Sequence, residues 1–168
     1  QAQEMIGRQV KHLARLVDDL LDVSRMSRDK ILLRKEPLDL VPLVRAAVED
    51  HRPLLTETKL ALAVEAPEGP LWVQGDATRL SQIVGNLLHN ANKFTDCGGQ
   101  VTVRLTAGSD ARSAMLTVTD SGIGMGPEIL DRLFEPFSQA DRSLAGSRGG
   151  LGLGLALVKG LVELHGGS

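Results

Sequence analysis

Four polar side chains recur along the segment 76–95 with the spacing of one face of an α-helix. Gln82, Asn86, Asn90 and Lys93 follow one another at steps of four, four and three residues, so on a helix they form a single polar stripe. Amide oxygens are hard ligands suited to Mg²⁺, and an ammonium group pairs with phosphate oxygens. The stripe therefore predicts a site for a metal-bound polyphosphate, although a solvated face of an ordinary amphipathic helix has the same pattern.

A first glycine-rich segment, DSGIGM, begins at Asp120 directly after an alternating apolar run that predicts a strand. A carboxylate at the end of a strand can accept a hydrogen bond from an exocyclic amine such as that of adenine. Gly122 and Gly124 would let the backbone approach the base closely. The same pattern also describes many turns.

A second glycine-rich segment, residues 146–155, leads into an apolar-periodic helix. The N-terminus of such a helix offers unpaired N–H groups and the positive end of a dipole to phosphates. The segment lacks the Gly-Lys-Ser/Thr of a P-loop and does not follow the dinucleotide pattern Gly-x-Gly-x-x-Gly. Its predicted phosphate-binding residues are Gly150, Leu151, Gly152, Leu153, Gly154 and Leu155.

Together these segments resemble the conserved boxes of the histidine protein kinases, members of the GHKL ATP-binding superfamily. The matching strings are, in order, NLLHNANKFT for the N box, DSGIGM for the first glycine box, FEPFSQAD for the F box and GGLGLGLAL for the second glycine box. The resemblance covers about residues 31–168, and the wording of the N and F boxes is similar to that of hybrid sensor kinases.

The resemblance implies a protein-histidine kinase that uses ATP and Mg²⁺. By this likeness Asp120 would bind the adenine amine and Asn90 would hold Mg²⁺ against the phosphates. Asn86 and Lys93 would lie next to them in catalytic and nucleotide-binding roles. Gln139 would lie near the γ-phosphate, where family members often carry a polar or basic residue.

Residues 1–28 differ in character from the rest of the chain. Their apolar residues recur with alternating steps of four and three, which is typical of a coiled-coil or bundle helix. The segment resembles the second helix of the dimerisation and histidine-phosphotransfer domain, although a lone amphipathic helix lying on the domain would have the same periodicity. We therefore expect that helix in 1–28 and an ATP-binding catalytic domain in 29–168, ending before its last strands.

The phosphoaccepting histidine of the family, in a motif like His-Glu-Leu-Arg-x-Pro, has no counterpart here. His12, His51, His89 and His165 lack the following acid. We expect a fragment that transfers the γ-phosphoryl group to a helix outside this chain, in a longer parent kinase. The resemblance implies that this parent is a homodimer and signals to the receiver domain of a response regulator.

Three other classes of protein share parts of this pattern. GHKL ATPases and related serine kinases carry a glutamate at the position of Asn86, and a neutral amide cannot take a proton from water. A pseudokinase, acting as a nucleotide-gated scaffold without catalysis, is the third alternative. The presence of every box expected for ATP binding disfavours it.

Composition narrows the class of partner. The net charge of −2 over 168 residues offers no basic excess for nucleic acid or for an acidic membrane surface. Cys97 is the single cysteine, which suits a reducing compartment, and no apolar run approaches the length of a membrane span. We expect a cytoplasmic domain without direct membrane contact, whose parent could be anchored by other segments.

The pattern of elements predicts a two-layer α/β sandwich with helices on one face of a mixed sheet. We expect 60–65 to pair with 71–74 across the turn 66–70, and 100–107 to form a hairpin with 112–119. A lid is expected at 135–150. Helices are predicted at 3–28, 40–56, 76–94 with Asp76 as N-cap, 126–133 and 152–165, and a further strand at 31–36.

Overall fold

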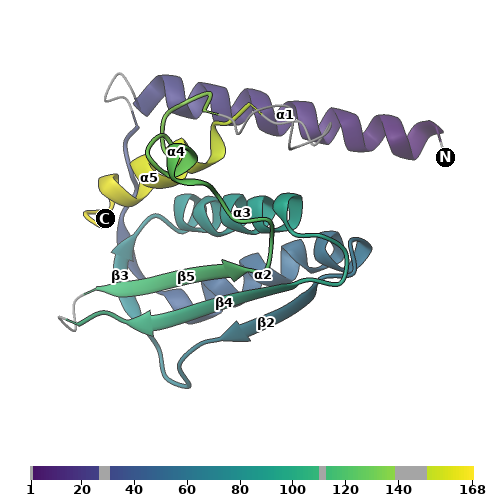
Figure 1. The fold of residues 1–168 in the computed structure, drawn as a ribbon. Coiled ribbons are helices and arrows are strands. Elements are labelled where there is room, and N and C mark those ends of the chain that lie inside the picture. Colours follow the sequence, from purple (N-terminus) through teal and green to yellow (C-terminus); the bar gives the residue numbers. More distant parts are fainter. Residues whose placement is uncertain (1, 27–30, 110–112, 139–150) are drawn as a thin grey trace.

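The computed structural model describes residues 2–26, 31–109, 113–138 and 151–168. Figure 1 shows strands β2, β4 and β5 on one side of the molecule and helix α1 on the opposite side, with α3 and α5 between them. The elements in chain order are α1 (Ala2–Met26), β1 (Glu36–Asp39), α2 (Leu40–Glu57), β2 (Ala61–Glu65), β3 (Trp72–Gly75), α3 (Ala77–Phe94), β4 (Gln100–Ala107), β5 (Ala114–Asp120), α4 (Pro127–Leu130) and α5 (Gly154–Leu164). The predicted fold class is confirmed.

The strands form two sheets. β1 pairs with β3 in antiparallel fashion, while β4 lies between β2 and β5 in a mixed sheet. The predicted hairpin of β4 and β5 is confirmed, with Val101 opposite Asp120. The predicted pairing of 60–65 with 71–74 is wrong, because β2 runs parallel to β4. Parallel neighbours need a crossover connection, and here β3 and α3 supply it.

The strand predicted at 31–36 begins only at Glu36 and ends at Asp39. Its register is set by β3, in which Gly75 lies opposite Glu36. Asp39 fixes the other end, because its Oδ1 accepts hydrogen bonds from the backbone N–H of Val41 at 3.0 Å and of Leu71 at 2.9 Å. One carboxylate therefore caps α2 and ties it to the start of β3.

Helix α3 has two buried faces. Val84 and Leu88 pack with α2 against the inner face of the mixed sheet, in a core that includes Val101 and Val103. Ile83 packs on the other side in a second cluster, whose members from α5 and α1 are Leu157, Val158, Leu161, Val23 and Met26. These two contacts fix the rotation of α3 about its axis, and with it the directions of its polar residues.

Asp76 is the N-cap of α3, as predicted, and accepts a hydrogen bond from Arg79 N at 3.2 Å. Its second oxygen accepts from Arg34 N at 3.0 Å, and its own backbone N–H donates to His165 Nε2 at 3.0 Å. Burial acts to raise the pKa of Asp76, but backbone hydrogen bonds from Arg34, Arg79 and Thr78 together hold that pKa below its ordinary value. The Asp76 carboxylate thus joins the start of α3 to the segment before β1. The backbone N–H of Asp76 joins the same point to His165, directly after α5.

The apolar stripe of α1 stays largely exposed. Ile6 and Leu13 are each 62% exposed, and Val10, Val17 and Leu20 are also exposed. Within the described ranges, no helix has both the length and the apolar character required to span a bilayer. The helix predicted at 3–28 is confirmed and spans Ala2–Met26.

Candidate nucleotide-binding site

Asn86 lies on α3 and faces the start of α5. Its Oδ1 is 3.8 Å from the position that a Cβ atom would take on Gly154. Its Nδ2 is buried and has no hydrogen-bond partner among the described residues. A buried amide without a partner costs free energy, so such groups in folded proteins call for a ligand or an ordered water. The structure therefore provides a donor for a group bound between α3 and α5.

Asp120 ends β5 next to the C-terminal end of α3. Its Oδ1 accepts a hydrogen bond from Gly122 N at 2.8 Å and lies 3.5 Å from the hydroxyl of Thr95. Ile123 N donates to Phe94 O at 3.2 Å, which ties the glycine segment to the same helix end. Among the described residues both contacts to the carboxylate fall on Oδ1, so Oδ2 keeps lone pairs for an amine donor.

The two glycines after Asp120 have different surroundings. A Cβ atom on Gly122 would lie 2.5 Å from Phe94 O and 2.6 Å from Asp120 Oδ1. Gly124 has φ +67°, in the left-handed region. A larger residue at 122 would push the carboxylate away from its present position.

Thr95 is a residue of this cluster that the sequence analysis missed. It follows α3 directly, is 4% exposed and contacts Asp120 from a position 25 residues earlier in the chain. A buried hydroxyl requires a partner, but the sequence alone does not show which carboxylate provides it.

Among the described residues, no side chain caps the start of α5. Leu153 is the N-cap residue and makes no side-chain capping hydrogen bond, since its side chain lies in the core at 2% exposure. Gly152 has φ +69° and a Cβ there would lie 2.5 Å from Ser138 O. Leu151 is exposed and Leu155 partly buried. Of the other predicted residues, Gly150 and Gln139 fall outside the described residues, as does most of the predicted lid.

Lys93 stands at the C-terminal end of the polar stripe. Burial lowers the pKa of its ammonium group, because desolvation disfavours the charged form. Its Nζ lies 4.7 Å from the centre of the Phe94 ring. A polyphosphate close to this ammonium would favour its charged form and be favoured by it.

Asn90 is partly buried and lies one turn after Asn86. Within the parts of the chain that the structure describes, no group of three or more His, Cys, Asp or Glu side chains could hold a metal ion. Asn90 offers an amide oxygen, which is a hard ligand of the kind that Mg²⁺ accepts in proteins.

The predicted polar stripe is divided between two surroundings. Asn86 lies near Gly154 at the start of α5, and Asn90 and Lys93 follow it toward Phe94, where α3 ends beside Gly122. Gln82 instead donates a hydrogen bond from Nε2 to Asp22 Oδ2 of α1 at 3.0 Å. The stripe on α3 is thus real, but its first member contacts another helix.

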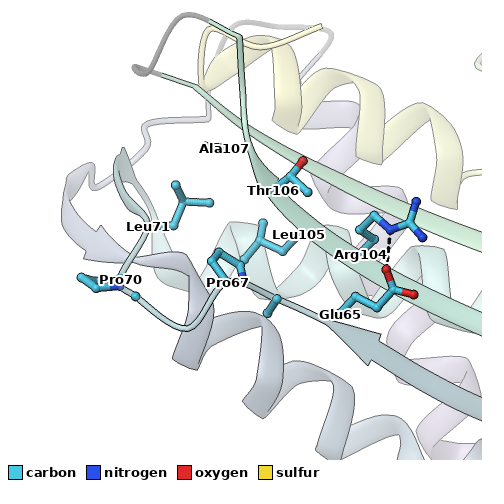
Figure 2. A pocket seen from close by; sticks show the side chains of 10 residues that line it. Glu65, Pro67, Pro70, Leu71, Arg104, Leu105, Thr106 and Ala107 are labelled. Carbon is cyan, nitrogen blue, oxygen red and sulfur yellow. Dashed lines mark hydrogen bonds and ion pairs between the residues drawn. The ribbon is translucent and has the colours of Figure 1, made fainter.

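A groove of about 520 Å³ lies elsewhere, between the segment 66–71 and the end of β4. Figure 2 shows Pro67, Leu71 and Leu105 lining it, with the ion pair of Arg104 and Glu65 beside them. None of the predicted site residues contributes to this groove. We place the candidate site by its polar groups, because the groove is mostly apolar and its ion pair is already satisfied.

The chain matches known proteins of one family. The profile described as "Histidine kinase-, DNA gyrase B-, and HSP90-like ATPase" matches residues 75–168. The histidine protein kinase DivJ of Caulobacter vibrioides is 39% identical over 164 residues, which cover 98% of this chain and 27% of DivJ. The signal transduction histidine-protein kinase BaeS of Escherichia coli is 36% identical over 95% of this chain and 33% of BaeS.

Solved structures agree with these matches. Full-length ShkA, solved in complex with AMPPNP, is 34% identical and superposes with a TM-score of 0.80 over 94% of this chain and 32% of that one. The histidine kinase AdeS of Acinetobacter baumannii is 25% identical with a TM-score of 0.73, over 95% of this chain and 71% of that one. The chain spans about a third or less of the curated relatives named above. It belongs to the histidine kinase-, DNA gyrase B- and HSP90-like ATPase family, and within that family it matches the ATP-binding catalytic part of sensor histidine kinases.

Proposed function

We propose that this chain binds Mg-ATP and transfers the γ-phosphoryl group to a histidine of a longer parent kinase. The observation that carries the proposal is the buried, unpaired Nδ2 of Asn86 beside Gly154 at the start of α5. A donor held in this way is suited to a phosphate oxygen at the N-terminus of a helix. The kinase names of DivJ and BaeS, and the AMPPNP complex of ShkA, support the same reaction.

The adenine end of the nucleotide would be bound at β5. Asp120, oriented through Oδ1 by Gly122 N, would accept a hydrogen bond from the exocyclic amine through its other oxygen. Gly122 and Gly124 would leave room for the base. Because guanine presents a carbonyl at the corresponding position, this carboxylate would select adenine over guanine.

The phosphate end would lie between α3 and α5. Backbone N–H groups of Gly150 to Leu155 would bind phosphate oxygens at the start of α5. Asn86 and Lys93 would donate to the same oxygens, and Asn90 would supply an amide oxygen to Mg²⁺. The bound ion would neutralise phosphate charge, so the residues of this chain mainly position the γ-phosphoryl group for in-line transfer. The role of Gln139 near that group stays a prediction from the resemblance.

The acceptor would be supplied by another segment of the parent kinase. We assign residues 1–28 to the second helix of its dimerisation and phosphotransfer domain and residues 29–168 to the catalytic domain. The exposed stripe of α1, with Ile6 and Leu13 each 62% exposed, would then pack in a bundle with the acceptor helix and a second copy. A response regulator would receive the phosphoryl group, and the catalytic domain would work in the cytoplasm, where ATP is available.

The experiment is a labelling reaction with γ-labelled ATP and Mg²⁺. The chain alone should stay unlabelled, whereas a separately supplied acceptor domain of the parent should gain acid-labile label. Asp120→Asn should slow this transfer when ATP is limiting. Stoichiometric label on His12, His51, His89 or His165 of this chain would overturn the proposal, and so would phosphate release without any transfer.

A further inference from the structure

Three polar side chains form a closed set of contacts between α1 and α3. Arg79 Nη1 lies 2.5 Å from Asp22 Oδ2 and donates to Gln82 Oε1 at 2.8 Å. Gln82 Nε2 completes the set by donating to the same Asp22 oxygen at 3.0 Å. The amide of Gln82 thus bridges the two charged groups, using its acceptor and a donor at once.

This contact is buried within the interface. The side chain of Asp22 is 8% exposed and that of Arg79 is 23% exposed. Salt screens such a pair much less than one at the surface. Removing one partner would leave an uncompensated charge inside the interface, which is strongly unfavourable. The ion pair is therefore unlike the pair of Arg52 and Glu49 on α2, whose side chains are 46% and 59% exposed.

An apolar contact accompanies the polar one. Val23 and Met26 of α1 pack on the second core cluster, and Met26 Cε occupies the space where a Cβ of Gly160 on α5 would be, 1.5 Å from that position. By contrast, Ile6, Val10 and Leu13 are each about 60% exposed. The described contacts of α1 with the rest of the fold thus involve its last two turns, and the remainder of the helix extends past them (Figure 1).

The elements that hold α1 are the same elements that line the candidate nucleotide site. Gln82 precedes Asn86 by one turn of α3, and α5 presents Gly154 to Asn86 and Gly160 to Met26. A change in the direction of α1 would therefore change the distance between the phosphate end of the site and whatever packs on the stripe of α1.

We propose that Asp22, Arg79 and Gln82 form a latch that sets the angle between α1 and the nucleotide-binding body. They are positioning residues, since in this structure they contact each other between α1 and α3. The importance of the latch for phosphoryl transfer rests on the proposed function, because it assumes that the acceptor helix packs on α1. Its structural part stands independently and can be tested without nucleotide.

The test is a spin-label distance measurement on the whole chain. With Cys97→Ser as background, labels at Leu13→Cys on α1 and Thr117→Cys on the outer face of β5 should give one narrow distribution. Asp22→Lys and Arg79→Glu should each broaden or shift it. The double variant should restore it, because the pair is re-formed with opposite polarity and Gln82 can still bond to both. Arg52→Glu, which breaks an exposed pair, should leave the distribution unchanged.

A milder variant keeps the test decisive if a charge reversal unfolds the chain. Gln82→Leu removes the bridging amide at similar volume and should broaden the distribution with little change in melting temperature. Unchanged distributions in the folded single variants would overturn the latch, as would failure of the double variant to restore the distance. Titration of the same samples with Mg-ATP separates the two proposals. Unchanged distance distributions in variants that still bind ATP refute only the latch, whereas absent ATP binding together with the expected changes in distance refutes only the proposed function.

Discussion

Replacement of Asn86 tests whether its amide is held for a ligand. In the structure its Nδ2 is buried without a partner among the described residues, and an unsatisfied buried group costs about 1–3 kcal/mol. Asn86→Ala removes that cost in the nucleotide-free protein. We therefore expect the variant to be at least as stable as the wild type while it binds nucleotide more weakly.

Asn92 provides a matched control on the same helix. It is also partly buried, but its Oδ1 accepts a hydrogen bond from the Thr58 hydroxyl at 2.5 Å. Asn92→Ala should lose a net contribution of about 0.5–1.5 kcal/mol. Because both changes exchange Asn for Ala within α3, the gain in helix propensity is common to both and cancels in the comparison.

Asn86→Ala should gain at least about 1 kcal/mol and Asn92→Ala should lose at least about 0.5 kcal/mol. The free energy of unfolding of Asn86→Ala should therefore exceed that of Asn92→Ala by about 1.5 kcal/mol or more. For a protein of this size that difference is roughly 3–6 °C in melting temperature. Thermal melts without nucleotide measure it. Calorimetry with Mg-ADP should then show affinity lower by about ten- to a hundredfold for Asn86→Ala, the equivalent of one hydrogen bond to a charged group, and unchanged affinity for Asn92→Ala. Equal melting temperatures together with equal nucleotide affinities would refute the reasoning.

Four further expectations concern single residues. Asp120→Asn should lower ATP affinity by about one to two powers of ten, since a charge-assisted acceptor is lost; unchanged affinity by calorimetry would remove the adenine assignment. Asn90→Ala should leave the melting temperature of the nucleotide-free protein nearly unchanged but abolish most of the Mg²⁺ dependence of ATP binding, and retained dependence would contradict metal ligation. The pKa of Asp76 is lowered in the folded state, so its carboxylate stabilises the fold above its unfolded pKa of about 3.9. That contribution should disappear as the pH falls through the folded pKa. In thermal melts at decreasing pH, the melting temperature of Asp76→Asn should therefore fall less steeply than that of the wild type. Because burial lowers the pKa of Lys93, nucleotide binding should raise it and take up protons at alkaline pH, which calorimetry in buffers of different ionisation enthalpy detects; Lys93→Met should abolish the uptake.

Local signals predicted the elements that hold the site. Asp76 before an apolar-periodic run predicted the start of α3, and the helix ends at Phe94 as expected. The hairpin of β4 and β5 followed from two alternating runs around a short polar turn. The motif predicted glycine at 122 for the approach of a ligand, whereas the structure adds a different reason, because a Cβ there would meet Phe94 O and Asp120 Oδ1. For the helix and the hairpin, the deciding interaction lies within a few residues of the pattern.

Contacts between distant segments could not be predicted in this way. The segment 66–70 has the composition of a hairpin turn, yet β2 pairs with β4, which begins 35 residues after the end of β2. Gln82 has the right spacing for the polar stripe, yet Asp22 of α1 is its partner across 60 positions. Periodicity shows which residues share a face of a helix. It does not show that Gln82 contacts α1 while Asn86, on the same face, lies near the start of α5.

The hydrogen bond from Asp76 N to His165 Nε2 joins residues 89 positions apart and has a consequence for synthesis of the chain. His165 Nδ1 is also 2.7 Å from Leu161 O, so the ring donates on one side and accepts on the other. During translation the N-cap of α3 can form as soon as Asp76 and Arg79 leave the ribosome, but its backbone N–H has this partner only after α5 has emerged. The nascent chain must therefore carry the amide-bearing helix, with its second apolar face not yet covered by α5, until that helix has been made.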